Sequence, residues 1–448
     1  MRNVIALMCV CYVLWRPVSN GAVLYPLLAL LTALAVSMIL TGERRVAKPF
    51  IVTAYLLVVA GLIAALVGSI NAAPGLTQQA IVWFGSIVIW GPWAMSLTRD
   101  RIRLTLSVFA FATVFLSGLI VLYIGAQQGL LPSLVPQSFL SSQDAGFDLT
   151  ADGSAIRLMG LSTLAAAGPL VSSALVSGRD TYLPSRKLLA LATVLSVVAA
   201  VAAGRRAIAL VTILSPLLTL LLLRFLRPQR KGSMARNRPA RWVLASPLLV
   251  VAGFIAWRLE LLARPLAALA DGLRVLLGFG ASDSFKGAGD LVRVRQSREL
   301  IAAWGEKPLF GHGLGAVLPD GFNRSPERPW MFELQYHDLL FTCGLVGAGL
   351  VLLALFSACI GIRRAAAMSP EHVPTLVATS VAALSMLVAN ASNPYLQAVG
   401  HVWSVALVLG VANALLRPRA QPDVAVDDAS SSGPADLGRR AAKRQLSR

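Results

Sequence analysis

Charged residues are scarce in this chain. They make up 14% of its 448 residues, whereas a soluble domain carries about 25%. Hydrophobic residues make up 56%, and the mean hydropathy is +0.70. Apolar runs of 17 to 22 residues, long enough to cross a bilayer, recur along the whole length. The composition therefore excludes an ordinary soluble protein and predicts an all-α polytopic membrane protein.

Cysteine is also rare, and all four cysteines lie within or at the ends of apolar runs. No pair lies in a polar loop and no Cys-x-x-Cys sequence occurs, which argues against a disulfide framework and against a cysteine metal site. Residues 3–15 resemble a signal peptide, but no small-residue cleavage site follows them before Pro17. We therefore expect them to be retained as the first helix.

The apolar runs predict about twelve transmembrane spans. They are expected near residues 3–16, 22–40, 50–70, 80–97, 104–125, 156–177, 188–204, 207–223, 242–257, 336–360, 375–392 and 398–416. The chain then consists of spans one to nine (1–257), a long loop (258–335), spans ten to twelve (336–416) and a tail (417–448). The tail is polar and lacks periodicity, so we expect it to be disordered.

Basic residues predict the orientation of these spans. With the N-terminus in the cytoplasm, the short cytoplasmic segments and the tail hold 26 of the 40 lysines and arginines, and the short opposite loops hold four. The other ten lie in the loop 258–335, and long loops are largely exempt from the positive-inside bias. We therefore expect both termini in the cytoplasm and the long loop on the opposite side. Because these clusters beside the membrane account for the net charge of +19, no nucleic-acid partner is expected.

Two adjacent arginines, Arg205 and Arg206, form a tight turn between two uncharged apolar runs. The turn falls on the side where short loops otherwise avoid positive charge. A charged residue at the membrane is a candidate functional residue by default. This favours a paired cationic site for an anionic ligand. The alternative is an ordinary turn whose arginines extend to lipid headgroups.

The stretch 291–306 in the long loop has a helical pattern. Arg293 shares the apolar stripe of this helix with Ser297 and Leu300, whereas Arg295 lies on the polar face. An arginine that faces protein or membrane needs a bound anion or a buried carboxylate. The spacing therefore singles out Arg293 as a candidate ligand-binding residue.

The segment PLFGHGLG at 308–315 carries three glycines. A nucleotide phosphate loop would need a preceding strand and a following Walker lysine, and the sequence indicates neither. A tight turn that re-enters the membrane is favoured instead. His312 within it could be a ligand or a base, although a turn histidine hydrogen-bonded to backbone is the simpler interpretation.

His337 and Asp338 open the tenth predicted span. Histidine titrates in the range that a general acid or base requires, and the alternative is polar decoration of the membrane interface. Asp338 and Glu333 are the substitute candidates for such a base. Asn393, in the short turn NASNPYLQ at 390–397, could line a sugar site or serve the turn itself, since Asn-Pro favours turns.

In their order these motifs resemble the O-antigen ligase and O-antigen polymerase superfamily, bacterial transferases of envelope glycans. The Ser-Arg-Gly type turn of that family corresponds to AGRRA at 203–207, with glycine in place of serine. Its arginine, helix and glycine-rich segment correspond to Arg293 and PLFGHGLG. Its His-Asn pair is His337 and Asp338 here, followed after a short spacing by Gly-Leu-x-Gly from Gly344. The resemblance covers roughly residues 185–350.

The resemblance implies a GT-C-like fold in the bacterial inner membrane, with the active site facing the periplasm. It implies transfer of a glycan from an undecaprenyl-diphosphate carrier to an acceptor hydroxyl. Arg205, Arg206 and Arg293 would bind the diphosphate, because the guanidinium fork bonds phosphate oxygens bidentately, and His337 would take the proton of the acceptor. The outer loops contain no Asp-x-Asp pair for a divalent cation, so we expect neither a metal nor another cofactor.

Three alternatives differ in acceptor or in class. An O-antigen ligase, which uses the lipid A core as acceptor, is slightly favoured by the number of spans. A polymerase of O-antigen or exopolysaccharide would use another lipid-linked repeat unit. A polytopic transporter or a flippase of lipid-linked glycans is the rival of another class. Such proteins usually have two related halves and a midplane site, and the sequence shows neither a repeat nor midplane charge.

Overall fold

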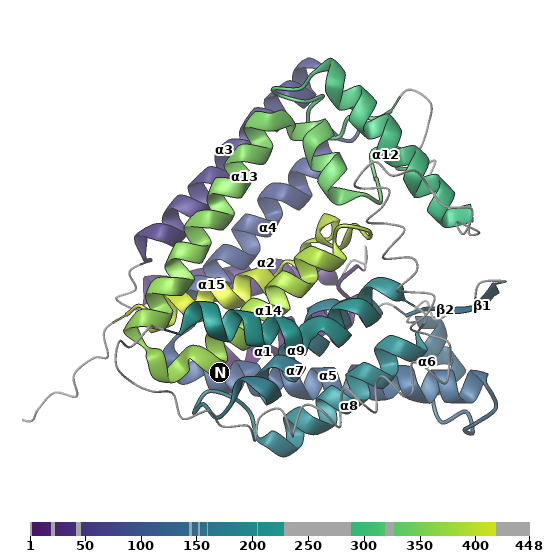
Figure 1. Ribbon diagram of the computed structural model, residues 1–448, viewed down its shortest axis with the longest axis vertical. Helices are drawn as coiled ribbons and strands as arrows, with labels where there is room; N and C mark the ends of the chain where they lie inside the picture. The colour runs from purple at the N-terminus through teal and green to yellow at the C-terminus, as the bar shows by residue number, and fades with distance from the viewer. Residues whose placement is uncertain are drawn as a thin grey trace, which may run out of the picture. The chain divides into compact units, whose positions relative to one another are not determined.

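The computed structural model describes residues 2–18, 23–41, 46–142, 146–150, 153–158, 160–203, 205–227, 288–318 and 327–417. In chain order (Figure 1), its elements are α1 (Arg2–Trp15), α2 (Leu24–Leu40), α3 (Lys48–Ile70), α4 (Leu76–Ser96), α5 (Arg99–Gln127), α6 (Gln137–Ser142), β1 (Gly146–Thr150), β2 (Gly153–Arg157), η1 (Leu161–Thr163), α7 (Leu164–Ser177), α8 (Arg186–Ala202), α9 (Arg206–Leu226), α12 (Ala288–Glu306), α13 (Gln335–Met368), η2 (Pro370–His372), α14 (Val373–Ala389), η3 (Tyr395–Gln397), η4 (Val399–His401) and α15 (Trp403–Leu415).

Apolar helices dominate the described chain, as the composition predicts. Five are long and apolar enough to cross a membrane: α3, α5, α9, α13 and the helix formed by η2 and α14. Every predicted span overlaps a helix except 242–257, which lies outside the described residues. Residues 258–287 of the predicted long loop and the tail from residue 418 also lie outside the described residues. The helices are those of a multi-pass membrane protein, and the number of twelve crossings stays a prediction.

The predicted span 156–177 begins too early in the sequence. Residues 153–157 form strand β2, which pairs antiparallel with β1 so that Gly146 lies opposite Arg157. Helix α7 begins only at Leu164, after the single turn η1. The Asp-Gly sequence at 152–153 is a hairpin signal, and it outweighs the apolar pattern that follows. The described part of the chain is thus helical with one short hairpin.

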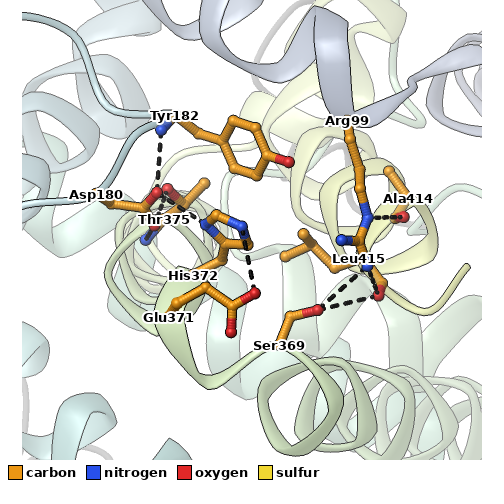
Figure 2. Close-up of polar contacts among 9 residues, drawn as sticks. All are labelled: Arg99, Asp180, Tyr182, Ser369, Glu371, His372, Thr375, Ala414 and Leu415. Atoms are coloured by element: carbon orange, nitrogen blue, oxygen red, sulfur yellow. Dashed lines mark hydrogen bonds and ion pairs between the residues drawn. The ribbon is translucent and has the colours of Figure 1, made fainter. Parts of the chain in front are cut away.

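Polar contacts join several loops at one end of the helices, called here the Arg99 end. Arg99 donates to Ser369 Oγ (3.3 Å) and to the carbonyl of Leu415 (2.9 Å). His372 Nδ1 donates to Asp180 Oδ1 across 2.9 Å, and Figure 2 shows both groups of contacts. The charge pattern of the sequence assigns all of these loops to the cytoplasm.

A second set of contacts defines the opposite end, called here the His337 end. Asn71 Nδ2 donates to the carbonyl of His312 (2.9 Å), and Gln397 Nε2 donates to Asp338 Oδ2 (3.2 Å). These residues belong to segments that the charge pattern assigns to the outer side. In the described part of the chain, both sets of contacts therefore join segments of the same predicted side. Which end faces the cytoplasm stays a prediction.

Helix α7 is the most deeply buried of the bundle, and α8, α9 and α14 pack against it. Its first turns are made of small residues, Ala165, Ala166, Ala167 and Gly168, which let neighbouring backbones approach closely. Two hydroxyl pairs tie it to α9: Ser215 donates to Ser172 (3.0 Å) and Thr219 to Ser173 (2.8 Å). Because apolar burial gives no driving force between helices in lipid, such close packing and hydroxyl bonds hold helices together there.

Helix α13, which runs beside α3 (Figure 1), is broken at Gly344. The glycine has φ 61° and ψ −169°, a conformation that side chains disfavour. The segment after α12 fills the break, because Leu345 N donates to the carbonyl of Pro308 (2.9 Å) and Val346 N to that of Leu309 (3.0 Å). The tenth predicted span is therefore made of two helical pieces. The short first piece carries His337.

Candidate functional site

The site lies where α12 meets the chain that leads into α13. Helix α12 packs against α13, and Leu300 is fully buried in a small core with Phe332 and Phe341. Arg295, on the opposite face, is exposed. The helical spacing in the sequence predicts these two faces.

Arg293 forms an ion pair with Glu333, with Nε 2.7 Å from Oε2. Both side chains are partly exposed, at 35% and 25%. Gln296, which is buried, accepts from the backbone N–H of Glu333 (2.8 Å) and of Leu334 (3.3 Å). The buried amide thus fixes the backbone of Glu333 beside Arg293. The sequence left a bound anion or a buried carboxylate open as the partner of Arg293, and in the structure Arg293 pairs with the partly exposed carboxylate of Glu333.

His337 lies one helical turn farther along the same interface. Its Nε2 is 3.1 Å from Ser297 Oγ, and both residues are partly buried. If the serine hydroxyl donates, Nε2 keeps a lone pair and Nδ1 carries the proton. Residues 293, 297, 333 and 337 therefore form one cluster, the α12–α13 site, with a guanidinium, a carboxylate, a hydroxyl and an imidazole.

Asp338 points away from that cluster into the protein and is only 4% exposed. Gln397 Nε2 donates to its Oδ2 (3.2 Å), and Gln335 Nε2 lies 3.4 Å from the same oxygen. Within the described part of the chain, its Oδ1 has no hydrogen-bond donor. Asp338 therefore links the first turn of α13 to η3, and its burial leaves its carboxylate less accessible to a substrate hydroxyl than the partly buried His337.

The glycine-rich segment packs directly against other backbone. Gly311, Gly313 and Gly315 have φ of 69°, 93° and 78°, and a Cβ on Gly313 would overlap the backbone of Gly68. Several of the N–H groups are already used: His312 N donates to the carbonyl of Phe341 (2.8 Å), and Gly313 N donates to a carbonyl in α13 (2.9 Å). A phosphate cradle needs free N–H groups, so the glycines serve close packing.

His312 serves the same packing. Its Nε2 donates to the carbonyl of Ala303 in α12 across 2.7 Å, and its ring stacks on Phe341 with centroids 4.7 Å apart. This geometry agrees with the simpler interpretation of a histidine bonded to backbone. It joins α12 to α13 beside the α12–α13 site.

Arg205 lies toward the same end of the protein as His337. Near the end of α9, Phe225 lies 4.7 Å below the guanidinium carbon of Arg363, which is close to the Arg99 end. Because α9 has 21 residues and is about 30 Å long, its first turn lies toward the His337 end. The side chain of Arg206 lies outside the described part of the chain. The polar contact of His337 is with Ser297.

The turn between α14 and α15 uses its asparagines locally. Asn393 Nδ2 donates to the neighbouring Ser392 Oγ (3.2 Å), and its carbonyl accepts from Tyr395 N (2.7 Å). Asn390 is buried and accepts from Leu396 N (2.9 Å). These bonds fit the turn chemistry that the Asn-Pro sequence favours.

A second buried polar cluster, at the Arg99 end, was not predicted from the sequence (Figure 2). The fully buried Asp180 carboxylate accepts from His372 Nδ1 (2.9 Å), Thr375 Oγ1 (2.6 Å) and the N–H of Tyr182 (3.0 Å). Burial raises the pKa of Asp180, but these hydrogen bonds outweigh it and hold the pKa below its ordinary value. The cluster fastens the loop before α8 to the start of α14. Its partners are 192 residues apart, and no sequence pattern links them.

In the described part of the chain, no three His, Cys, Asp or Glu side chains come together in a way that could hold a metal ion. Compared with models of known protein families and with curated proteins, the chain matches none. The chemistry of the α12–α13 site is therefore the basis for assigning a function.

Proposed function

We propose that the protein is a membrane glycosyltransferase of the O-antigen ligase type. It transfers a glycan from an undecaprenyl-diphosphate carrier to an acceptor hydroxyl, with the lipid A core as the acceptor. The His337 end faces the periplasm, both termini lie in the cytoplasm, and the membrane is the bacterial inner membrane. The fold is GT-C-like, with about twelve spans.

One observation carries this proposal: a guanidinium and an imidazole lie on the same helix–helix interface, where α12 meets the candidate membrane span α13. Arg293 and His337 are held there by Glu333 and Ser297. A diphosphate-linked donor needs a cation for its leaving group, and an acceptor hydroxyl needs a base. Arg293 would supply the cation and His337 the base.

In the reaction, the diphosphate of the donor displaces Glu333 from Arg293, and Arg205 approaches from the same end. The acceptor hydroxyl replaces Ser297 at His337 Nε2 and gives its proton to that nitrogen. Its oxygen forms a bond to the anomeric carbon, while the bond from that carbon to the diphosphate oxygen breaks. The bonding pair leaves with the diphosphate, whose added charge the arginines stabilise.

The test is transfer by the purified protein in liposomes, with a synthetic undecaprenyl-diphosphate glycan and either lipid A core or a second lipid-linked glycan as acceptor. We expect product on lipid A core, unchanged by EDTA. Product only on the lipid-linked glycan would make the protein a polymerase. Movement of the donor across the bilayer without any product would make it a flippase and refute the transferase.

A further inference from the structure

A groove of about 350 Å³ lies between the end of α3 and residues 307–311, away from the proposed reaction site. Its apolar walls include Ile70, Leu309 and Phe310, which are 75%, 58% and 50% exposed. Lys307 and Asn71 form its polar rim. We propose that this groove binds an anionic glycerophospholipid, with the headgroup phosphate on Lys307 and the upper acyl chain against the apolar walls.

Backbone hydrogen bonds hold the segment that forms one wall of the groove. Leu314 N donates to the carbonyl of Ala64 in α3 (2.9 Å), and Leu345 N donates to that of Pro308 (2.9 Å). The segment that carries Leu309 and Phe310 is thus bonded to both α3 and α13. Two large apolar side chains are held outward by a fixed backbone, and an apolar partner must cover them if they are to leave water.

The position of the groove relative to the membrane favours a lipid as that partner. Leu62, Leu66 and Ile70 are exposed at spacings of four along α3, so one apolar stripe of this candidate span leads into the groove. The helix has 23 residues and a length of about 34 Å, slightly more than the hydrocarbon core of a bilayer. Its last turn, with Lys307 beside it, therefore lies at the level of the headgroups.

The rim selects a negative headgroup. Lys307 Nζ donates to Asn71 Oδ1 (3.2 Å), while Asn71 donates to the carbonyl of His312 (2.9 Å). An ammonium has three donors, so Lys307 keeps two for a phosphate after it has bonded Asn71. A headgroup with its own ammonium would bring a like charge to Lys307, whereas phosphatidylglycerol would not.

The occupant differs from the glycan donor. Lys307 directly follows the last residue of α12 and comes ten residues after Ser297, which is about 15 Å along the helix axis. A diphosphate bound at Lys307 would hold its sugar too far from His337 for attack by an acceptor positioned there. The inference thus stands whether or not the protein is a transferase.

The test uses the full chain in mild detergent and native mass spectrometry with phosphatidylglycerol or phosphatidylcholine of equal acyl chains. We expect tighter binding of phosphatidylglycerol, weakened at least about tenfold by Lys307→Gln through loss of a charged hydrogen bond. Lys187→Gln, which removes an exposed lysine at the start of α8, is the matched control and should change nothing. Phe310→Ser should weaken both lipids.

Three outcomes would overturn the inference. Equal affinity for the two lipids would remove the selectivity for negative charge. An equal effect of the Lys187 and Lys307 substitutions would reduce the binding to general surface charge. Displacement of phosphatidylglycerol by undecaprenyl diphosphate, lost in Lys307→Gln, would assign the groove to the donor lipid instead.

Discussion

Ser297 Oγ and His337 Nε2 lie 3.1 Å apart and join the long helix α12 to the first turn of α13. The contact places a hydroxyl where an acceptor hydroxyl must come if His337 is a base. A donating serine also selects the tautomer in which Nε2 is free to take a proton. In the proposed mechanism, the serine holds the imidazole in this tautomer until the acceptor hydroxyl replaces it.

His337→Ala should lower transfer by about 10²–10⁴-fold, the usual contribution of a general base. Ser297→Ala should lower it by about tenfold or less, because it removes a single neutral hydrogen bond. Transfer rate and donor binding are measured separately, and donor binding should survive both changes. Near-normal turnover of His337→Ala would show that His337 is not the base and would leave Glu333 or Asp338 as the candidate.

Arg293→Ala should lower transfer about 10- to 150-fold, since a hydrogen bond to a charged group contributes about 1.5–3 kcal/mol. Arg298→Ala is the control, because that side chain is exposed on the same helix. Glu333→Gln should leave donor affinity unchanged or raise it, since it removes the carboxylate that competes with the diphosphate. If the two arginine variants behave alike in the liposome assay, Arg293 has no part in diphosphate binding.

Asp338→Asn should be tolerated and Asp338→Ala should destabilise the protein by about 1–3 kcal/mol, the cost of leaving buried polar groups unsatisfied. Within the described part of the chain, no cationic side chain pairs with this buried carboxylate, and the amides of Gln335 and Gln397 contact it. The neutral asparagine keeps shape and polarity. Thermal unfolding in detergent checks the difference, and a greater loss with asparagine would show that the negative charge itself is needed.

Gly313→Ala should prevent α12 from docking, because φ is 93° and the added Cβ would overlap the backbone of α3 at Gly68. Gly305→Ala is the matched control: it lies in α12 with open space around its Cβ position and should add about 0.5–1 kcal/mol of helix stability. Limited proteolysis of the segment after α12 distinguishes the two variants. Equal protection would mean that the backbone contact can relax.

Asp180→Ala should destabilise the Arg99 end by about 3–5 kcal/mol at neutral pH, the range for breaking a buried pair. The pKa of Asp180 is lowered in the folded protein, so its contribution is complete above the unfolded value of about 4 and is lost as pH falls through the lower folded value. Unfolding temperatures measured from pH 7 down to pH 3 check this. The unfolding temperature of the variant should fall less than that of the wild type as the pH is lowered. An equal fall in both proteins would contradict the stabilising role of the Asp180 carboxylate.

Local pattern was sufficient to predict much of this protein. Helices overlap the predicted spans in the described residues because long apolar runs have a single stable form in lipid, with every backbone group bonded within the helix. The faces of α12 also follow from spacing alone, since residues 293, 297 and 300 recur on one side of a helix. Arg293 and His337 could therefore be chosen as candidates before any contact was known.

Contacts between distant segments were decided only by the tertiary structure. Glu333 is the partner of Arg293 across 40 residues, and Asp180 is the partner of His372 across 192. The break of α13 at Gly344 depends on backbone hydrogen bonds that residues 308–313 donate to α13 and accept from it. No local propensity encodes these bonds. The sequence determined where helices form and which faces are polar, because those depend on neighbours in the chain. The tertiary structure decided which polar groups meet, because that depends on how the helices pack.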